Sequence, residues 1–442
     1  MTLHRTEPRP GAGIVHLGLG AFLRAHGAVY VGEAMARSGG NWGIVGVSLQ
    51  STGTRDALLP QDCVYTALEL GPQGRAPRLV TSVVDVLVAF EDPEAVLAQM
   101  ADPAIRIVTL TVTEKGYCHD PSSGALNLAH PDIVHDLAHP LPQSAPGYLV
   151  RALQRRRAAG LRPFTVVSCD NLPQNGQVAR AVVLALAQAL DPALAAWIAV
   201  EGRFPATMVD RIVPATKPED IAALQTLTGY HDAAPVMHEP FRQWVVEDDF
   251  VDGARPDLAG VGVQMVQDVT AFEHMKLRML NGAHSALAYL GYLAGHQTIA
   301  DTVADPVFAG FVRHLWTAEI IPALTPPPGV DLSAYAAALF SRFANGAIRH
   351  RTWQIAMDGS QKLPQRILAT LSETVAAGRA SPGLILAVAA WMRYVGGVDE
   401  AGGAIDVKVP MAARLLSLSD GAVGSVGKVD ALLSVLEIFP PV

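Results

Sequence analysis

Short β-rich runs alternate with helix-favouring segments through residues 1–268 of the chain and then stop. The runs are rich in β-branched and apolar residues and read IVHLGLG, WGIVGVSL, RLVTSVVDVLVAF, IRIVTLTVTE and FTVVSCD. This alternation is typical of a mostly parallel sheet with helical crossovers. From 269 to 442 the sequence favours helices, broken by PPPG, SPG and GG. It therefore predicts an α/β domain over 1–268 and an all-helical domain over 269–442.

Composition and charge narrow the class of protein. The 442 residues are too many for one ordinary core, and the net charge of −8 comes from 33 basic and 41 acidic residues without a long run of either sign. This distribution contains no basic cluster of the kind that binds nucleic acid, so we expect no nucleic-acid partner. Scattered cysteines at 63, 118 and 169 predict reduced thiols. The N-terminus has no apolar signal-peptide core, so we expect a cytoplasmic protein.

The longest segment without charged side chains, 279–300, is too polar for a membrane span. Its apolar run is interrupted by Asn281, His284, His296 and Gln297. This composition favours a buried or site-lining helix, and we expect no membrane partner. The sequence leaves the oligomeric state open.

Two glycines follow the first β-rich run. Gly18 would allow a tight turn there, and Gly20 would let the backbone approach a pyrophosphate. Leu23 occupies the place of a third glycine, and an ordinary strand-to-helix turn explains two glycines equally well. The position inside a βαβ pattern favours a Rossmann-like dinucleotide-binding domain. The second strand ends at Gln50 without the acid that usually holds the adenosine ribose, so NAD and NADP stay open.

Polar residues follow two later strands. Asp170 is the last residue of the run FTVVSCD, and Asn171 follows it. Ligands of an open α/β sheet gather at the carboxyl ends of its strands, so a substrate could be bound here. An amide there can donate a hydrogen bond to an oxyanion. The alternative is a simple turn, because Asp, Asn, Pro and Gly all favour turns. Glu114, after another strand, has the same two interpretations.

The segment EHMKLRMLNGAHS places a lysine, an amide and an imidazole in a helix-favouring run. On a regular α-helix with Lys276 at zero, Glu273 falls at about 60°, His284 at about 80° and Asn281 at about 140°. These four groups therefore share roughly one face. Together they can hold and protonate a carbonyl oxygen. A solvated helix face that happens to carry Lys and His explains the same spacing.

Taken together, these segments resemble the long-chain polyol dehydrogenase family of mannitol dehydrogenases and hexuronate reductases. The resemblance extends over nearly the whole chain and is carried by GLGAFLRAH, LTVTEKGYC, SCDNLPQNG, FPATMVDRIVP, EPFRQWVVEDDF and KLRMLNGAHSALAYLGYLAG. The combination of SCDN with KxxxxNxxH is more specific than any single segment.

The resemblance implies metal-independent hydride transfer between a nicotinamide cofactor, NAD with NADP not excluded, and a secondary alcohol or ketone. Lys276 corresponds to the family's general acid/base, and His284 to the histidine that binds and orients the substrate. The amides that polarise the carbonyl oxygen correspond to Asn171 and Asn281. Two carboxylates near the site correspond to Asp210 and to Glu273, the latter a candidate for passing protons to solvent. Cofactor contacts are expected at Gly18, Gly20, Phe22, Arg24 and Glu114.

No HExxH, CxxC or clustered His and Cys pattern is present in the sequence. We therefore expect no metal site, in agreement with the family.

Four basic residues lie within eighteen positions near the DGS tripeptide: Arg349, Arg351, Lys362 and Arg366. One or two of them are candidates to clamp a substrate carboxylate, because arginine offers a bidentate fork. A solvated basic helix face is the alternative for any single residue.

Within the family, RHRTWQIAMDGSQKLPQR and WMRYVGGVDEAG resemble the fructuronate reductase (mannonate oxidoreductase) branch. The implied reaction is the NAD(P)-dependent interconversion of D-fructuronate and D-mannonate. The rival is a mannitol 2-dehydrogenase or a related enzyme of polyols or hexuronates, such as arabinitol or tagaturonate. A nucleotide-binding protein without catalysis is a third interpretation, which a turnover assay would distinguish.

Overall fold

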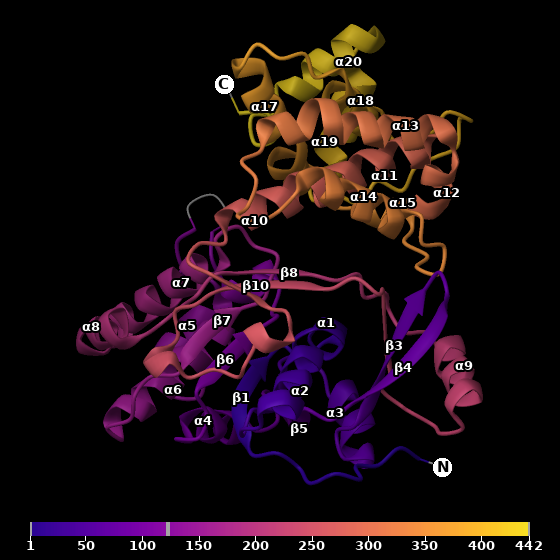
Figure 1. Cartoon of the computed structure of the whole chain (residues 1–442). Helices are drawn as coiled ribbons and strands as arrows, with labels where there is room; N and C mark the ends of the chain where they lie inside the picture. The colour runs from indigo at the N-terminus through magenta and orange to yellow at the C-terminus, as the bar shows by residue number, and fades with distance from the viewer. Residues whose placement is uncertain (1, 121–123, 441–442) are drawn as a thin grey trace. The chain divides into compact units, whose positions relative to one another are not determined.

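The computed structural model describes residues 2–120 and 124–440 and divides the chain into two compact units, Met1–Val269 and Thr270–Val442 (Figure 1). Unit 1 contains the sheets, and unit 2 is largely helical. The predicted combination of a Rossmann-like α/β domain with a helical C-terminal region is thus confirmed.

A five-stranded parallel sheet forms the centre of unit 1, in the order β5-β2-β1-β6-β7. Its strands are β1 (Ala12–Leu17), β2 (Gly43–Ser48), β5 (Val83–Val88), β6 (Ile107–Leu110) and β7 (Thr165–Ser168). Nearly all their residues are buried, as expected of a parallel sheet covered on both faces. The chain leaves β1 toward β2 on one side and later returns to β6 on the other. This reversal of strand order marks where such sheets bind ligands.

Two apolar cores cover the faces of this sheet. One packs against the helices α4 (Pro93–Ala101), α5 (Pro131–Ala138), α6 (Ala145–Ala158), α7 (Asn175–Leu190) and α8 (Pro192–Glu201). The other packs against α1 (Ala21–Ala25), α2 (Gly27–Ser38) and α3 (Gly53–Leu58). Helices on both faces explain why the sequence of these strands is continuously apolar rather than alternating.

Unit 1 has two smaller sheets. One has the order β11-β10-β8 and the other β4-β3-β9. Their strands are β3 (Tyr65–Gly71), β4 (Gly74–Val80), β8 (Thr207–Asp210), β9 (Val236–His238), β10 (Gln243–Glu247) and β11 (Gln264–Val266), and α9 (Pro218–Thr228) lies between β8 and β9 in sequence. The β-rich run RLVTSVVDVLVAF contains both the end of β4 and the whole of β5. Only Thr81 and Ser82 separate the two strands.

Unit 2 begins with a helix that runs without a break from Thr270 to Leu293. Its middle part, η5 (Lys276–Gly282), is π-helical and lies between α10 (Thr270–Met275) and α11 (Ala283–Leu293). Two further π-helical segments follow, η6 (Leu315–Ile320) and η8 (Pro364–Leu368), and both contact η5.

The α-helices that follow in unit 2 pack against α11, against the π-helical segments or against one another. They are α12 (Ile299–Ala304), α13 (Pro306–His314), α14 (Leu332–Phe343), α15 (Thr352–Ala356), α16 (Gly359–Leu363), α17 (Ala369–Ala376), α18 (Pro382–Tyr394), α19 (Ala412–Gly421) and α20 (Gly424–Leu433). Trp316 and Trp391 are among the largest fully buried side chains. The buried guanidinium of Arg278 forms a bidentate ion pair with Glu373 of α17, at 2.5 and 2.7 Å.

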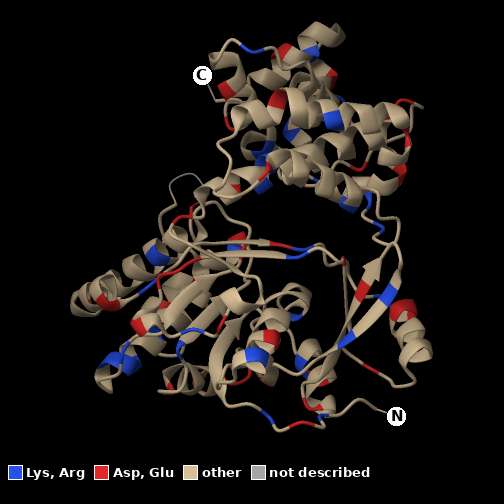
Figure 2. Cartoon of the chain, in the orientation of Figure 1, with Lys and Arg blue, Asp and Glu red and all other residues tan. Residues whose placement is uncertain are grey.

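Basic and acidic residues are interspersed along the elements of each unit (Figure 2). Among the helices of the described ranges, none is both long enough and apolar enough to cross a membrane. The three cysteines are free and buried.

Candidate active site

The turn after β1 has the geometry predicted for Gly18. This residue has a φ of +92°, and a Cβ placed on it would lie 2.2 Å from the carbonyl oxygen of Thr111, just beyond β6. Only glycine fits there, because a side chain would collide with the neighbouring backbone. A Cβ on Gly20 would meet nothing closer than the Gly18 oxygen, at 3.7 Å, so the backbone at Gly20 is open to a ligand. Leu23, in the place of a third glycine, is buried in the apolar core.

A cleft of about 690 Å³ lies at the carboxyl ends of three strands of the central sheet. Leu49 and Gln50 line it beyond β2, Phe90 beyond β5, and Val112 and Thr113 beyond β6. Thr113 has a φ of +64°, which is a costly conformation for a β-branched residue. A cleft at this edge of the sheet is where an open α/β fold accommodates an extended ligand.

The other three expected cofactor contacts lie in different settings. Arg24 donates to the carbonyl oxygens of Ala234 at 2.6 Å and Gly20 at 3.3 Å, so its guanidinium braces the turn. Phe22 is half-buried and stacks on the ring of His26 at 4.9 Å. Glu114 is exposed at the start of a short 3-10 helix after β6.

Asn171 is exposed and lies between two residues that are held in place by hydrogen bonds. The carboxylate of Asp170 accepts from the backbone N–H groups of Val112 at 3.0 Å and Thr113 at 2.9 Å, and from the Tyr117 hydroxyl at 2.8 Å. Burial raises the pKa of Asp170, while these hydrogen bonds favour its charged form.

On the other side of Asn171, the amide of Asn175 is fully buried and tied to β8. It donates to the carbonyl oxygens of Asp170 at 3.0 Å and Thr207 at 2.9 Å, and it accepts from the Thr207 N–H at 2.9 Å. The segment is therefore more ordered than a simple turn. Asp210 is the last residue of β8 and is buried. The sequence indicated Asn171 and Asp210, but not the supporting roles of Asp170 and Asn175.

In unit 2, the π-helical segment η5 corrects the predicted arrangement of the lysine cluster. A regular α-helix would place Asn281 at about 140° from Lys276. In a π-helix the backbone hydrogen bonds join residues five apart, so Lys276 and Asn281 come about one turn apart on the same side. His284 then follows Asn281 by three residues, as neighbours on an α-helix do. The indole N–H of Trp316 donates to the Met279 carbonyl oxygen inside the segment, at 2.8 Å.

The cluster on this helix is largely withdrawn from solvent. Lys276 and His284 are each 7% exposed, while Asn281 and Glu273 are half-buried. The ring of His284 stacks on Phe343 at 5.0 Å. Burial lowers the pKa of His284 well below its ordinary value, and the neighbouring His350, Arg366, Arg342 and Lys362 lower it further. His284 is therefore a neutral imidazole surrounded by positive charge.

The four candidate carboxylate binders divide into two pairs. Arg349 and Arg351 are exposed in the segment between α14 and α15. Lys362 and Arg366 are partly buried, and both lower the pKa of His284. Arg366 donates to the hydroxyl of Ser285 at 3.1 Å, and Lys362 donates to the Met357 carbonyl oxygen at 2.8 Å. Burial lowers the pKa of both cations, and Arg366 lowers that of Lys362 further.

Gly282 sets how closely η5 and η8 approach. A Cβ on this residue would lie 2.6 Å from the carbonyl oxygen of Arg366, which is too short for a van der Waals contact. Glycine therefore lets the two backbones meet and fixes Arg366 beside the segment that carries Lys276 and Asn281.

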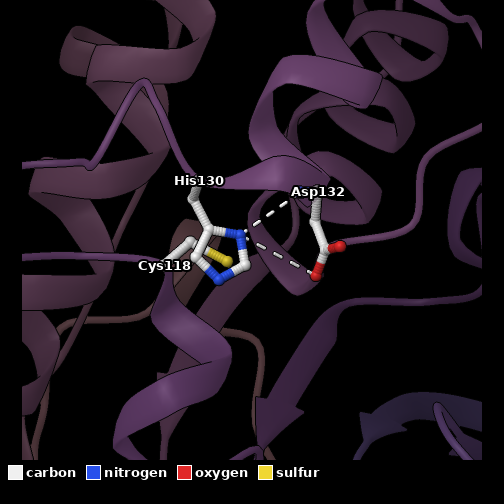
Figure 3. Close-up of side chains that lie close together, drawn as sticks. All are labelled: Cys118, His130 and Asp132. Atoms are coloured by element: carbon white, nitrogen blue, oxygen red, sulfur yellow. Dashed lines mark hydrogen bonds and ion pairs between the residues drawn. The ribbon is translucent and has the colours of Figure 1, made fainter.

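One group in the described ranges has side chains of the types that bind metals. Figure 3 shows Cys118, His130 and Asp132, whose potential ligand atoms lie within 4.8 Å of one another along the cleft of unit 1. His130 also has another role in the fold. Nδ1 of His130 accepts from the Asp132 N–H at 3.3 Å and caps α5. Burial raises the pKa of Cys118 to about 12, which keeps the thiol protonated. Sequence spacing did not predict this group.

Known protein families match both units. Residues 12–260 match the mannitol dehydrogenase Rossmann domain, and residues 268–441 match the mannitol dehydrogenase C-terminal domain. The chain belongs to the mannitol dehydrogenase family of oxidoreductases.

Several relatives match over almost the whole length of this mannitol dehydrogenase family member. The D-mannonate oxidoreductase of Escherichia coli (strain K12) is 50% identical over 431 residues, 96% of this chain and 88% of the relative. A mannitol 2-dehydrogenase of Pyrenophora tritici-repentis (strain Pt-1C-BFP) is 44% identical over 91% of this chain and 72% of its own.

A solved structure of the mannitol dehydrogenase family also matches. It is the Pseudomonas fluorescens mannitol 2-dehydrogenase in a ternary complex with NAD and D-mannitol. This match has a TM-score of 0.88 and 40% identity and covers 99% of this chain and 92% of the other.

Proposed function

We propose that this member of the family is an NAD-dependent fructuronate reductase, which interconverts D-fructuronate and D-mannonate. One observation carries the choice of a sugar acid over a neutral polyol: the positive surroundings of His284. Three cationic side chains, Arg342, Lys362 and Arg366, lower the pKa of this buried imidazole. A substrate carboxylate would offset that charge, whereas a hydroxymethyl group would not. The 50% identity to a D-mannonate oxidoreductase supports the same choice.

Unit 1 fits a dinucleotide at the edge where its strand order reverses. Gly18 permits the tight turn, the backbone at Gly20 is open, and the cleft beyond β2, β5 and β6 has room for the adenosine half. Gln50, at the end of β2, is neutral and exposed in this cleft. NAD, when bound, exchanges a hydride with the carbon that carries the substrate oxygen. The relative solved with NAD supports the choice of this cofactor.

The side chains of this chain handle the substrate oxygen. In the reducing direction Lys276 donates a proton to that oxygen, and in the oxidising direction it removes one. The amides of Asn281 and Asn171 donate hydrogen bonds to the oxygen as negative charge develops on it. Because an amide is uncharged, it stabilises the alkoxide without competing with the lysine for a proton. His284 orients the substrate, and Glu273 passes protons between Lys276 and solvent.

We expect Asn171→Ala and Asn281→Ala each to lower kcat by about 10²-fold or more, with a smaller rise in KM. The reason is that a hydrogen bond to an oxyanion strengthens as charge develops in the transition state. Steady-state kinetics on fructuronate would measure both constants, with Asn41→Ala as a control because Asn41 is exposed on unit 1. If a variant lost thermal stability but kept the wild-type kcat, the role of that asparagine would be structural and not catalytic.

Activity should survive exhaustive treatment with EDTA. The reaction proposed above needs no metal, because Lys276 handles the proton and the amides of Asn171 and Asn281 stabilise the charge on the substrate oxygen. The test compares rates before and after dialysis against the chelator, with the metal content of the dialysed protein measured separately. Loss of activity that zinc restores would overturn the metal-free mechanism.

The assignment is tested by comparing rates for fructuronate, tagaturonate and fructose with NADH and with NADPH. The proposal predicts the highest kcat/KM for fructuronate with NADH. Preference for tagaturonate would keep the sugar-acid class and change the substrate within it. No turnover with any ketone would favour a nucleotide-binding protein that has lost catalysis.

A further inference from the structure

A second histidine of unit 2, His350, lies against the candidate substrate histidine. The ring centroids of His284 and His350 are 4.7 Å apart, and the planes meet at 66°, so one ring points its edge toward the other. His350 comes from the segment between α14 and α15, and the sequence patterns gave it no role. It lies in the same unit as Lys276, Lys362 and Arg366.

The polar edge of His350 is not used by the fold. Its Nδ1 atom is buried and has no hydrogen-bond partner among the described residues. A buried polar atom without a partner costs free energy, because its hydrogen bond to water has been given up. Such atoms are few in native proteins and call for an explanation. A ligand that binds beside His284 would supply the partner.

The backbone around His350 is well fixed. Its carbonyl oxygen accepts from the Ile299 N–H at 3.0 Å, and its own N–H donates to Ile348 at 2.9 Å. Next to it, Arg351 pairs with Thr298 in an isolated β-bridge. The ring is thus held by a rigid segment, as a group that selects a ligand must be.

The charge of His350 suits a hydroxyl group. Burial lowers its pKa to about 4, so near neutral pH the ring is uncharged and each nitrogen makes one hydrogen bond as donor or acceptor. A hydroxyl group can both donate and accept, and so it pairs with either tautomer. A carboxylate would bind more strongly to the cationic side chains of Arg366 and Lys362 than to this neutral ring.

We propose that His350 is a substrate-binding residue whose Nδ1 forms a hydrogen bond with a hydroxyl group of the sugar chain, beside His284. The proposal rests on the proposed function in that it takes the substrate to be a polyhydroxylated ketone or acid. It assigns two recognition tasks to different side chains: the carboxylate to the cations and a hydroxyl to a neutral imidazole. The alternative is that His350 only packs against His284.

Two substitutions separate these roles. His350→Asn keeps a polar atom close to the position of Nδ1, whereas His350→Phe keeps a ring against His284 but removes both nitrogens. His296→Phe is the matched control, since His296 is a histidine of the same unit whose ring contacts Phe308, with ring centroids 5.5 Å apart. The measurements are kcat and KM for fructuronate, the affinity of the enzyme–NADH complex for D-mannonate by calorimetry, and the melting temperature.

For His350→Phe we expect KM and the dissociation constant of D-mannonate to rise by about 10-fold or more, with a smaller change in kcat. Its melting temperature should not fall, because the substitution removes a buried unpaired atom. His350→Asn should retain affinity within a few-fold, and His296→Phe should match the wild type.

Wild-type affinity in His350→Phe would overturn the proposal, and so would equal weakening in the Asn and Phe variants together with lowered melting temperatures. Failure of the proposed function would look different. The wild-type enzyme would then prefer another substrate, such as fructose, and the same variants would be compared on that substrate with D-mannitol as the calorimetric ligand.

Discussion

Lys276→Ala is expected to remove nearly all turnover while leaving the affinity for NADH almost unchanged. The substitution deletes the group that donates a proton to the substrate oxygen, whereas the cleft proposed for the cofactor belongs to unit 1. A general acid contributes roughly 10² to 10⁴ in rate, so kcat should fall by about that factor. The measurements are kcat on fructuronate and the affinity for NADH by fluorescence titration.

The control for Lys276 is Lys428→Ala, because Lys428 is an exposed lysine on α20 and removing it changes net charge equally. Its kcat should equal that of the wild type. Retention of more than about a tenth of the wild-type kcat by Lys276→Ala at neutral pH would contradict the assignment of the general acid.

A comparable effect is expected when the charge of the substrate is removed. Fructuronate should be reduced with a kcat/KM about 30-fold to 1,000-fold above that of fructose, which corresponds to about 2 to 4 kcal/mol for one charge-assisted contact. With fructose, the charge-assisted contact that Arg366 or Lys362 is proposed to make with the substrate would be lost. Fructose reduced as efficiently as fructuronate would refute the carboxylate clamp and identify a mannitol 2-dehydrogenase.

The four basic residues near the DGS tripeptide provide their own controls. Arg366→Met and Lys362→Met should lower the preference for fructuronate by about 10-fold and leave the rate with fructose nearly unchanged. Arg349→Met and Arg351→Met should behave as the wild type, because these two side chains are exposed. The reverse outcome would place the clamp on the exposed pair.

Much of the fold follows from the sequence pattern, because strands buried on both faces read as continuous apolar runs. The same property hides boundaries between strands. Apolar residues continue from β4 into β5 with only Thr81 and Ser82 between them, so periodicity gives no sign that the chain changes sheets. The single β-rich run RLVTSVVDVLVAF therefore covers parts of two different sheets.

The sequence proposed residues for the candidate site but could not predict their geometry. The angular positions assumed for Glu273, Lys276, Asn281 and His284 came from the period of a regular α-helix, and no side-chain pattern marks a hydrogen bond between residues five apart. Likewise, sequence spacing could not divide the four basic residues into buried and exposed pairs, since that division depends on what packs against each. His350 has no signal in the sequence, because its significance lies in a contact with a residue sixty-six positions away.

The π-helical segment makes the helix from Thr270 to Leu293 sensitive to its length. Each residue turns an α-helix by about 100°, so a change of one residue between Lys276 and His284 would rotate the lysine away from the imidazole. Substitutions in this interval leave the angle between Lys276 and His284 around the helix axis unchanged. Insertions and deletions do not, even when every proposed catalytic side chain is retained. Residue count across the segment is therefore as much a requirement for the proposed site as the identity of its side chains.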